Sequence, residues 1–176
     1  MSSMQPSIRF ACDAMCGGLA RWLRGLGYDA TWTEGIDDAE VVEQARRDGR
    51  VLISSDGGIF ERRIVADGTV RSLRLPRGLK LLGQVEYVVR ALGLTVHPAR
   101  CMACNGELRR VERAEVGDRV PARSLLWATE FFECRSCGRV VWNGTHWRRI
   151  EAVRRRMGEL GGAADDEIPP GGEDRG

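Results

Sequence analysis

Short apolar runs alternate with stretches of helical periodicity over roughly the first 95 residues of the chain. The runs IRFACD and VLISS are typical of buried strands; the first ends on Asp13 and the second is followed by Asp56. We expect strands at 8–13, 29–33, 51–55 and 69–75, and helices at 14–27, 39–48, 57–66 and 79–92. Strands that alternate with helices across short loops form a parallel sheet with helices on both faces. The pattern therefore predicts a three-layer α/β/α unit.

The spacing of large apolar residues also predicts which helix faces are buried. In the helix at 14–27, one face carries Met15, Leu19, Trp22, Leu23 and Leu26. In the helix at 79–92, the core face carries Leu82, Val85, Val88, Val89 and Leu92. Cys12 and Cys16 lie at a strand end and on the next helix, where cysteine commonly packs as a small hydrophobe. We expect both thiols in the core.

The character of the chain changes near residues 95–100, where Pro98 interrupts the pattern and the paired cysteines begin. The net charge of +2 hides an asymmetry, because residues 97–157 carry 13 basic and 7 acidic groups. Residues 158–176 carry 1 basic and 6 acidic groups and are rich in Gly and Pro, a composition typical of disorder. We therefore predict an α/β unit at 6–96, a small cysteine-containing unit at 97–150, and a basic helix end followed by a disordered acidic tail at 151–176.

Several classes of protein are excluded by the sequence. No apolar run approaches the ~20 residues of a membrane helix, and MSSMQPSIRF lacks the apolar stretch of a signal peptide. No P-loop, dinucleotide-binding glycine motif or nucleophile elbow occurs. Lys80 is the one lysine, and both histidines, His97 and His146, lie outside the first half. We expect a cytoplasmic protein that does not bind membranes or use lysine-based catalysis.

Four of the six cysteines form two C-x-x-C pairs, Cys101 with Cys104 and Cys134 with Cys137. In a reducing compartment such pairs indicate metal binding and not disulfides. Four thiolates around Zn²⁺ make a closed structural site with no position for substrate. The 29 residues between the pairs exceed the usual ribbon spacing, so we expect the intervening strands to form a longer excursion. The pattern predicts a β-rich zinc ribbon.

Carboxylates follow two of the predicted strands. Asp13 and Asp56 end the first and third strands, and Asp38 falls in the first turn of a helix whose cap is Asp37. Ligands of a parallel sheet gather at the carboxyl ends of its strands. Oxygen ligands without a nearby histidine select Mg²⁺ or Mn²⁺, which can polarise a phosphoryl group and activate water. Strand-end aspartates also cap helices, and that structural alternative stays open for Asp13 and Asp56.

Phosphoacceptor receiver domains provide a rival interpretation of the same spacing. They carry two adjacent acids after the first strand and a lysine after a late strand. Here Cys12 replaces one of the acids, and Lys80 lies beside a helix start instead. These two differences disfavour the receiver interpretation.

Cations and aromatic rings are interleaved as single-stranded nucleic acid binding requires. Arg21 and Arg24 are about one turn apart on the first helix and could hold a phosphate near the carboxylates. Exposure of both arginines on a solvated helix face is an equally good interpretation. The candidate RNA-binding residues of the cysteine-containing unit are Arg135, Arg139, Arg148, Arg149 and Trp147. The alternative for Trp142 and Trp147 is hydrophobic packing of a small unit.

Two groups of motifs resemble the Mut-seven C-terminal RNase family. The first is the run from Asp13 to Asp29 with Asp37-Asp38 and Val51–Asp56; the second is Arg100-Cys-x-x-Cys-Asn-Gly, Phe132-x-Cys-x-x-Cys-Gly-Arg and Trp142-x-Gly-Thr-His-Trp. The resemblance covers about residues 8–150. It implies a PIN-like nuclease domain joined to a four-cysteine zinc ribbon, with Asp13, Asp38 and Asp56 as the acidic ligands of Mg²⁺ or Mn²⁺.

The function implied by this resemblance is metal-dependent hydrolysis of single-stranded RNA, with the ribbon aiding RNA binding. The chain departs from the family at Cys16-Gly17-Gly18 and at Ser54-Ser55-Asp56-Gly57, where arginines near the site are missing. Two alternatives therefore stay open. One is a catalytically inactive module that binds RNA or the ribosome, and the other is an adaptor for protein partners such as RNA-processing factors.

Overall fold

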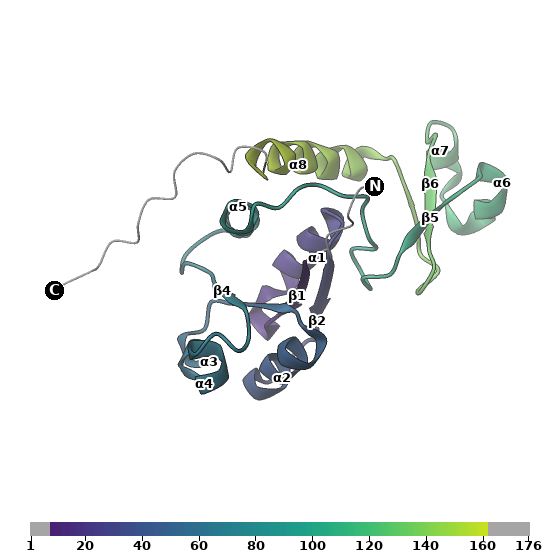
Figure 1. Cartoon of the computed structure of the whole chain (residues 1–176). Coiled ribbons are helices and arrows are strands. Elements are labelled where there is room, and N and C mark those ends of the chain that lie inside the picture. The colour runs from purple at the N-terminus through teal and green to yellow at the C-terminus, as the bar shows by residue number, and fades with distance from the viewer. Residues whose placement is uncertain (1–7, 162–176) are drawn as a thin grey trace, which may run out of the picture.

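A parallel four-stranded sheet organises the first part of the chain in the computed structural model, which describes residues 8–161 (Figure 1). Its strands are β1 (Arg9–Cys12), β2 (Asp29–Trp32), β3 (Val51–Ser54) and β4 (Ser72–Arg74), in the order β2-β1-β3-β4. All three strand pairs are parallel, which confirms the sheet that the sequence predicts. The central strands β1 and β3 are buried on both sides, as their near-continuous apolar sequences require.

Helices cover both faces of this sheet. Phe10 and Cys12 of β1 point to one face and Ala11 to the other, because successive side chains of a strand alternate. The first face packs against α1 (Gly17–Gly25), α5 (Leu81–Leu92) and α8 (Thr145–Gly161). The second packs against α2 (Asp38–Asp48), α3 (Gly57–Glu61) and α4 (Arg63–Ala66). The predicted three-layer α/β/α architecture is confirmed.

Some predicted details differ from the structure. The helix expected at 14–27 starts with a 3-10 turn, η1 (Ala14–Cys16), which changes the phase of its side chains and leaves Met15 83% exposed. The helix expected at 57–66 is two helices, because Arg62 is extended between them. Leu82 is 40% exposed, since the core contacts of α5 begin one turn later at Val85. Cys12 and Cys16 are buried as predicted.

A second, antiparallel sheet forms the cysteine-containing unit. It consists of β5 (Leu108–Val111), β6 (Phe131–Cys134) and β7 (Val140–Trp142) in sequence order. The excursion between β5 and β6 is helical where strands were expected, and comprises α6 (Arg113–Val116), η2 (Gly117–Arg119) and α7 (Ala122–Leu125). The antiparallel sheet and this helical excursion share a small core of their own, formed by Val111, Val116, Val120, Ala128 and Phe131.

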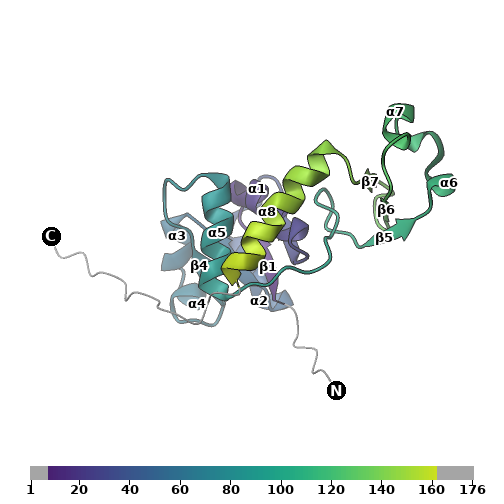
Figure 2. The same cartoon turned by 90° about the horizontal axis from the view of Figure 1, so that it is seen from above.

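The last helix returns to the first unit. α8 crosses the predicted boundary at residue 150, lies beside α5 and buries Met157 to 1% exposure in the core of the α/β unit (Figure 2). Arg156 also forms an ion pair with Glu86 of α5. Within residues 8–161, no helix is both long and apolar enough to cross a membrane. Residues 162–176 of the predicted acidic tail lie outside the described residues.

Candidate functional site

Asp13 is a buried carboxylate at the carboxyl end of β1, 5% exposed. Its Oδ1 accepts the Met15 N–H at 3.0 Å, which caps the 3-10 turn, and its Oδ2 accepts the hydroxyl of Ser54. Ser54 lies on the adjacent strand β3, so the parallel pairing itself brings the two side chains together. The carboxylate is therefore fixed in orientation, and each oxygen keeps a further lone pair for a ligand.

Asp56 lies at the same edge of the sheet. Its backbone N–H donates to Ser54 Oγ at 2.9 Å, so a single hydroxyl connects Asp13 with Asp56. Its Oδ1 accepts the Gly58 N–H at 2.9 Å and caps α3, while the side chain is exposed. Asp38 is half-buried in the first turn of α2, and its neighbour Asp37 caps that helix by accepting the Glu40 N–H at 2.8 Å.

Carboxylate oxygens are ligands that a hard cation such as Mg²⁺ prefers. The three aspartates nevertheless lie too far apart to surround a single ion together. Within residues 8–161, the four paired cysteines are the one group of at least three acidic, thiol or imidazole ligands within 4.8 Å of each other. The three carboxylates are not drawn together to that distance. Mg²⁺ suits such an open arrangement, because it is usually held by one or two carboxylates together with waters and substrate phosphates.

A cation lies close to Gly57, the residue after Asp56, and the sequence pattern did not reveal it. Arg74, the last residue of β4, pairs in register with Ser54 of β3. A Cβ at Gly57 would lie 3.2 Å from Arg74 Nη2, and the guanidinium lies 5.6 Å from the centroid of the Phe60 ring. Arg74 thus supplies a positive charge at position 57, where the residue itself has none. Sheet pairing across 20 residues placed it there.

The two cysteine pairs form equivalent knuckles. The Cys101 N–H donates to Gly106 O at 2.8 Å and the Cys134 N–H to Arg139 O at 2.9 Å, five residues further along in each case. Asn105 and Gly138 occupy the same position after each pair and share a left-handed backbone, with φ of 70° and 69°. The backbone thus repeats the same turn around both pairs.

The four sulfur atoms fit a zinc ion. Cys101 Sγ lies 3.8 Å from Cys137 Sγ and Cys104 Sγ lies 3.4 Å from Cys134 Sγ. A tetrahedron with Zn–S bonds of about 2.3 Å has sulfur–sulfur edges of roughly 3.8 Å. Burial raises the pKa of the Cys134 thiol. Hydrogen bonds from the N–H groups of Cys137 and Ser136 and from the neighbouring thiols lower this pKa by more than burial raises it, so the net value is about 7. The N–H groups directed at this sulfur favour the thiolate of Cys134, whereas burial raises the pKa of Cys104 in the same cluster to about 12.

Gly106 is required by the packing of the two knuckles. A Cβ at this position would lie 2.6 Å from Cys134 Sγ and 2.5 Å from Ser136 Oγ. By contrast, a Cβ at Gly138 meets no atom within 4 Å. The first knuckle therefore approaches the second so closely that only glycine fits at the contact.

Arg24 attaches the first knuckle to α1. It is 5% exposed, and its Nε donates to Ala30 O at 2.8 Å. Its Nη1 donates to Met102 O at 3.2 Å and to Ala103 O at 3.0 Å, both within the knuckle. Burial lowers the pKa of this guanidinium. The three carbonyl groups that accept its hydrogen bonds favour the charged form. Arg24, a candidate for RNA binding in the sequence, is instead engaged inside the protein.

A second link joins the first knuckle to the edge strand β2. Asn105 Nδ2 donates to Asp29 Oδ1 at 2.7 Å, and Asn105 Oδ1 accepts the Ala30 N–H at 3.2 Å. Asp29 also pairs with Arg50, whose two terminal nitrogens donate to it at 2.7 and 3.1 Å. Burial raises the pKa of Asp29, but hydrogen bonds from Arg50 and Asn105 lower it more strongly, so the net shift is downward.

α8 supplies the third link. Arg154 donates from its terminal nitrogens to Gly25 O and, at 3.0 Å, to His97 O. Gly25 ends α1, so the cation lies where that helix leaves carbonyl groups unpaired. His97 also packs edge-on against Tyr28, with ring centroids 5.3 Å apart. The cysteine-containing unit is thus held to the α/β unit by several polar contacts.

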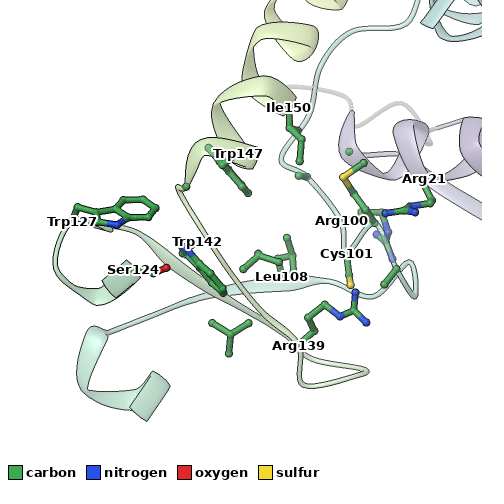
Figure 3. A pocket seen from close by; sticks show the side chains of 17 residues that line it. Arg21, Arg100, Cys101, Leu108, Ser124, Trp127, Arg139, Trp142, Trp147 and Ile150 are labelled. Atoms are coloured by element: carbon green, nitrogen blue, oxygen red, sulfur yellow. The ribbon is translucent and has the colours of Figure 1, made fainter. Parts of the chain in front are cut away.

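The other RNA-binding candidates remain on the surface. Arg21, Arg139 and Trp147 line a pocket of about 440 Å³ between α1, the first knuckle and the start of α8 (Figure 3). Three further candidates are exposed and do not line the pocket: Arg135, Arg148 and Arg149. Sequence reasoning missed Arg100 and Trp127, which also line it. The sequence signal for Trp127 was its place in the apolar run Leu125-Leu126-Trp127-Ala128, within a basic segment of the chain.

Comparison with known proteins finds one family model that spans both units. The family model described as the Mut7-C RNAse domain matches residues 8–154. The human protein named exonuclease mut-7 homolog is 36% identical over 171 residues, an alignment that covers 94% of this chain. The chain spans 18% of the length of that relative. No solved structure matches the chain significantly.

Proposed function

The chain belongs to the Mut7-C RNase domain family, and we propose that it is a metal-dependent ribonuclease acting on single-stranded RNA. The observation that supports this most directly is the network at the carboxyl edge of the sheet, where Ser54 connects Asp13 with Asp56. Ligands of open parallel sheets bind at this edge. We place the active centre there, with Asp13, Asp38 and Asp56 as ligands of Mg²⁺ or Mn²⁺.

Each side chain has a distinct role in this proposal. Asp13 is the fixed ligand, because Ser54 and the Met15 N–H hold its orientation. Asp38 and Asp56 are more exposed and can adjust when a metal and a phosphate arrive together. Arg74 lies beside Gly57, the residue that follows Asp56, and binds a phosphate oxygen of the substrate in this proposal. A divalent ion at this site would polarise the phosphodiester and supply an activated water.

The zinc ribbon has a binding role in this proposal. A closed four-cysteine site leaves no position for substrate, so its zinc stabilises structure. Arg135, Arg148 and Arg149 are exposed and carry charge that a phosphate backbone attracts. RNA is therefore the expected partner, held by the ribbon and cut at the sheet edge.

The test compares cleavage of single-stranded RNA by zinc-loaded wild type with cleavage by Asp13→Asn, Asp38→Asn and Asp56→Asn. Mg²⁺ or Mn²⁺ is added or omitted, and no chelator is used, so that the zinc stays in place. Asp37→Asn is the matched control, because asparagine caps a helix as well as aspartate does. We expect cleavage that requires the metal and is lost in the three variants, whereas the control retains it.

A second candidate function is an RNA-binding module without catalysis. The spacing of the three carboxylates favours it, since they do not converge on one ion in this structure. Wild type that binds RNA in a salt-dependent manner and cuts none with either metal would establish this alternative. Wild type that neither binds nor cuts RNA would favour a protein adaptor instead.

A further inference from the structure

The pocket between the two units has two chemically different ends. Three tryptophans, Trp127, Trp142 and Trp147, line one end, and three arginines, Arg21, Arg100 and Arg139, line the other (Figure 3). Apolar side chains such as Leu108 lie between them. The cysteine-containing unit and α8 contribute most of this lining, and α1 contributes Arg21 and Gly25, so α1 closes one side of the pocket.

The aromatic end is held in place by the surrounding backbone. Trp147 stacks on Phe132 with ring centroids 5.7 Å apart and planes 7° from parallel. A Cβ at Gly144 would lie 3.0 Å from Trp127 and 3.4 Å from Trp142, so the two indoles close around a glycine. Trp127 is nevertheless 46% exposed, which is unusual for an indole with only a structural role. The tryptophans therefore offer fixed, accessible aromatic surface.

In the described part of the chain, the cationic end has no carboxylate within ion-pair distance. Among the described residues, Arg21, Arg100 and Arg139 form no ion pair, and no carboxylate lines the pocket. Arg100 is the best ordered of the three, because its Nε donates to Asn105 O at 2.9 Å. Three guanidinium groups with no acid among them are complementary to an anion.

We propose that this pocket binds one unpaired nucleotide of an RNA strand, with the base against the tryptophans and a flanking phosphate on the arginines. Proteins that bind single strands combine stacking on aromatic rings with cations along the backbone, and both are present here. An apolar peptide would leave the three arginines without a counter-charge. The assignment deepens the proposed ribonuclease function and rests on it for the choice of RNA.

The position of the pocket relative to the carboxylates shapes what it does. Arg21 lies at the middle of α1 and Gly25 at its end, whereas Asp13 lies before its first turn. A helix of 9 residues is about 13.5 Å long, so a nucleotide in the pocket is not the one at the sheet edge. The pocket therefore selects an unpaired nucleotide at a fixed distance from the bond to be cut.

The first test is a titration of zinc-loaded protein, without added Mg²⁺ or Mn²⁺, into a labelled single-stranded RNA. A strand of equal length with abasic sites serves as the second probe. We expect wild type to bind the natural strand more tightly than the abasic strand. Trp127→Ala should weaken binding of the natural strand about tenfold, a typical effect of losing one stacked base. Binding of the abasic strand should not change. Leu126→Ala is the matched control, because Leu126 is 84% exposed and does not line the pocket.

The second test addresses the arginines through salt dependence. Arg139→Gln should weaken binding of both strands and reduce the slope of log K against log salt by about 0.7, the value of one phosphate contact. Arg123→Gln, exposed on α7 and outside the pocket, should leave that slope unchanged. Zinc content measured for every variant shows that the ribbon is intact.

Three results would overturn the pocket assignment. They are equal affinity of wild type for natural and abasic strands, equal loss for both strands in Trp127→Ala, and a free mononucleotide that binds as tightly as the strand. Cleavage is assayed separately with metal added. Wild type that fails to cut RNA but still distinguishes the two strands would refute the nuclease function and leave the pocket standing.

Discussion

Replacing Arg24 by methionine should destabilise the protein far more than the same replacement of Arg21, although both lie on α1 and are three residues apart. Arg24 is buried and donates three hydrogen bonds to backbone carbonyls, two of them in the first zinc knuckle. Arg21 is exposed and makes no hydrogen bond to the described residues. Methionine keeps most of the apolar stem, so the comparison isolates the guanidinium.

The expected magnitude follows from these contacts. A hydrogen bond with a charged donor contributes about 1.5–3 kcal/mol, and buried carbonyls without a donor add a desolvation cost. Two of the three bonds share one nitrogen, so we expect a loss of about 3–5 kcal/mol in total. This corresponds to a fall in Tm of roughly 10 °C for a chain of this size. Arg21→Met should change stability by less than about 0.5 kcal/mol.

The assay is urea unfolding of the zinc-loaded protein, combined with the rate of zinc transfer to a colorimetric chelator. Because Arg24 holds the Met102 and Ala103 carbonyls, Arg24→Met should also release zinc faster than wild type. Equal unfolding midpoints and equal zinc release for the two variants would refute the assignment of Arg24 as the link between the units.

Three further predictions concern the contacts around the ribbon. Gly106→Ala should lose zinc at lower chelator concentration than Gly138→Ala, because only the former brings a Cβ within 2.6 Å of a ligand sulfur. The folded-state pKa of Asp29 is depressed, so its contribution to stability is present above the ordinary pKa of 3.8 and is lost as pH falls below it. Asp29→Asn should therefore flatten the acid limb of a stability–pH curve, and an unchanged limb would contradict this. Arg154→Ala should make α8 more sensitive to limited proteolysis, whereas Arg155→Ala on the exposed face should not.

The local pattern of the sequence was sufficient to predict the strand and helix alternation. It also predicted the acids at the strand ends and the zinc ligands, since each depends on residues close together in the chain. Ser54 could have been found in the same way, as a hydroxyl that ends a buried strand two residues before Asp56. Asp38 was predicted to share an ion with Asp13 and Asp56, and that prediction is untested.

What the sequence could not show depends on contacts between distant segments. Arg24 falls four residues after Ala20, within the buried stripe of α1, and this position indicates a buried side chain. Its partners lie about 80 residues further along, so the hydrogen bonds themselves were not predictable. Arg74 reaches Gly57 through strand pairing, and the tryptophans meet the arginines only where the ribbon joins α1.

The return of α8 makes the α/β unit discontinuous in sequence. The chain leaves this unit after α5, builds the ribbon, and comes back to place Met157 in the core it left. The ribbon is therefore an inserted loop with two tethers, and zinc shortens that loop further by joining its interior. Loss of the ion would raise the entropy cost of docking α8 and uncover the apolar side of α5. Metal supply to the ribbon would then determine how long the α/β unit itself stays folded.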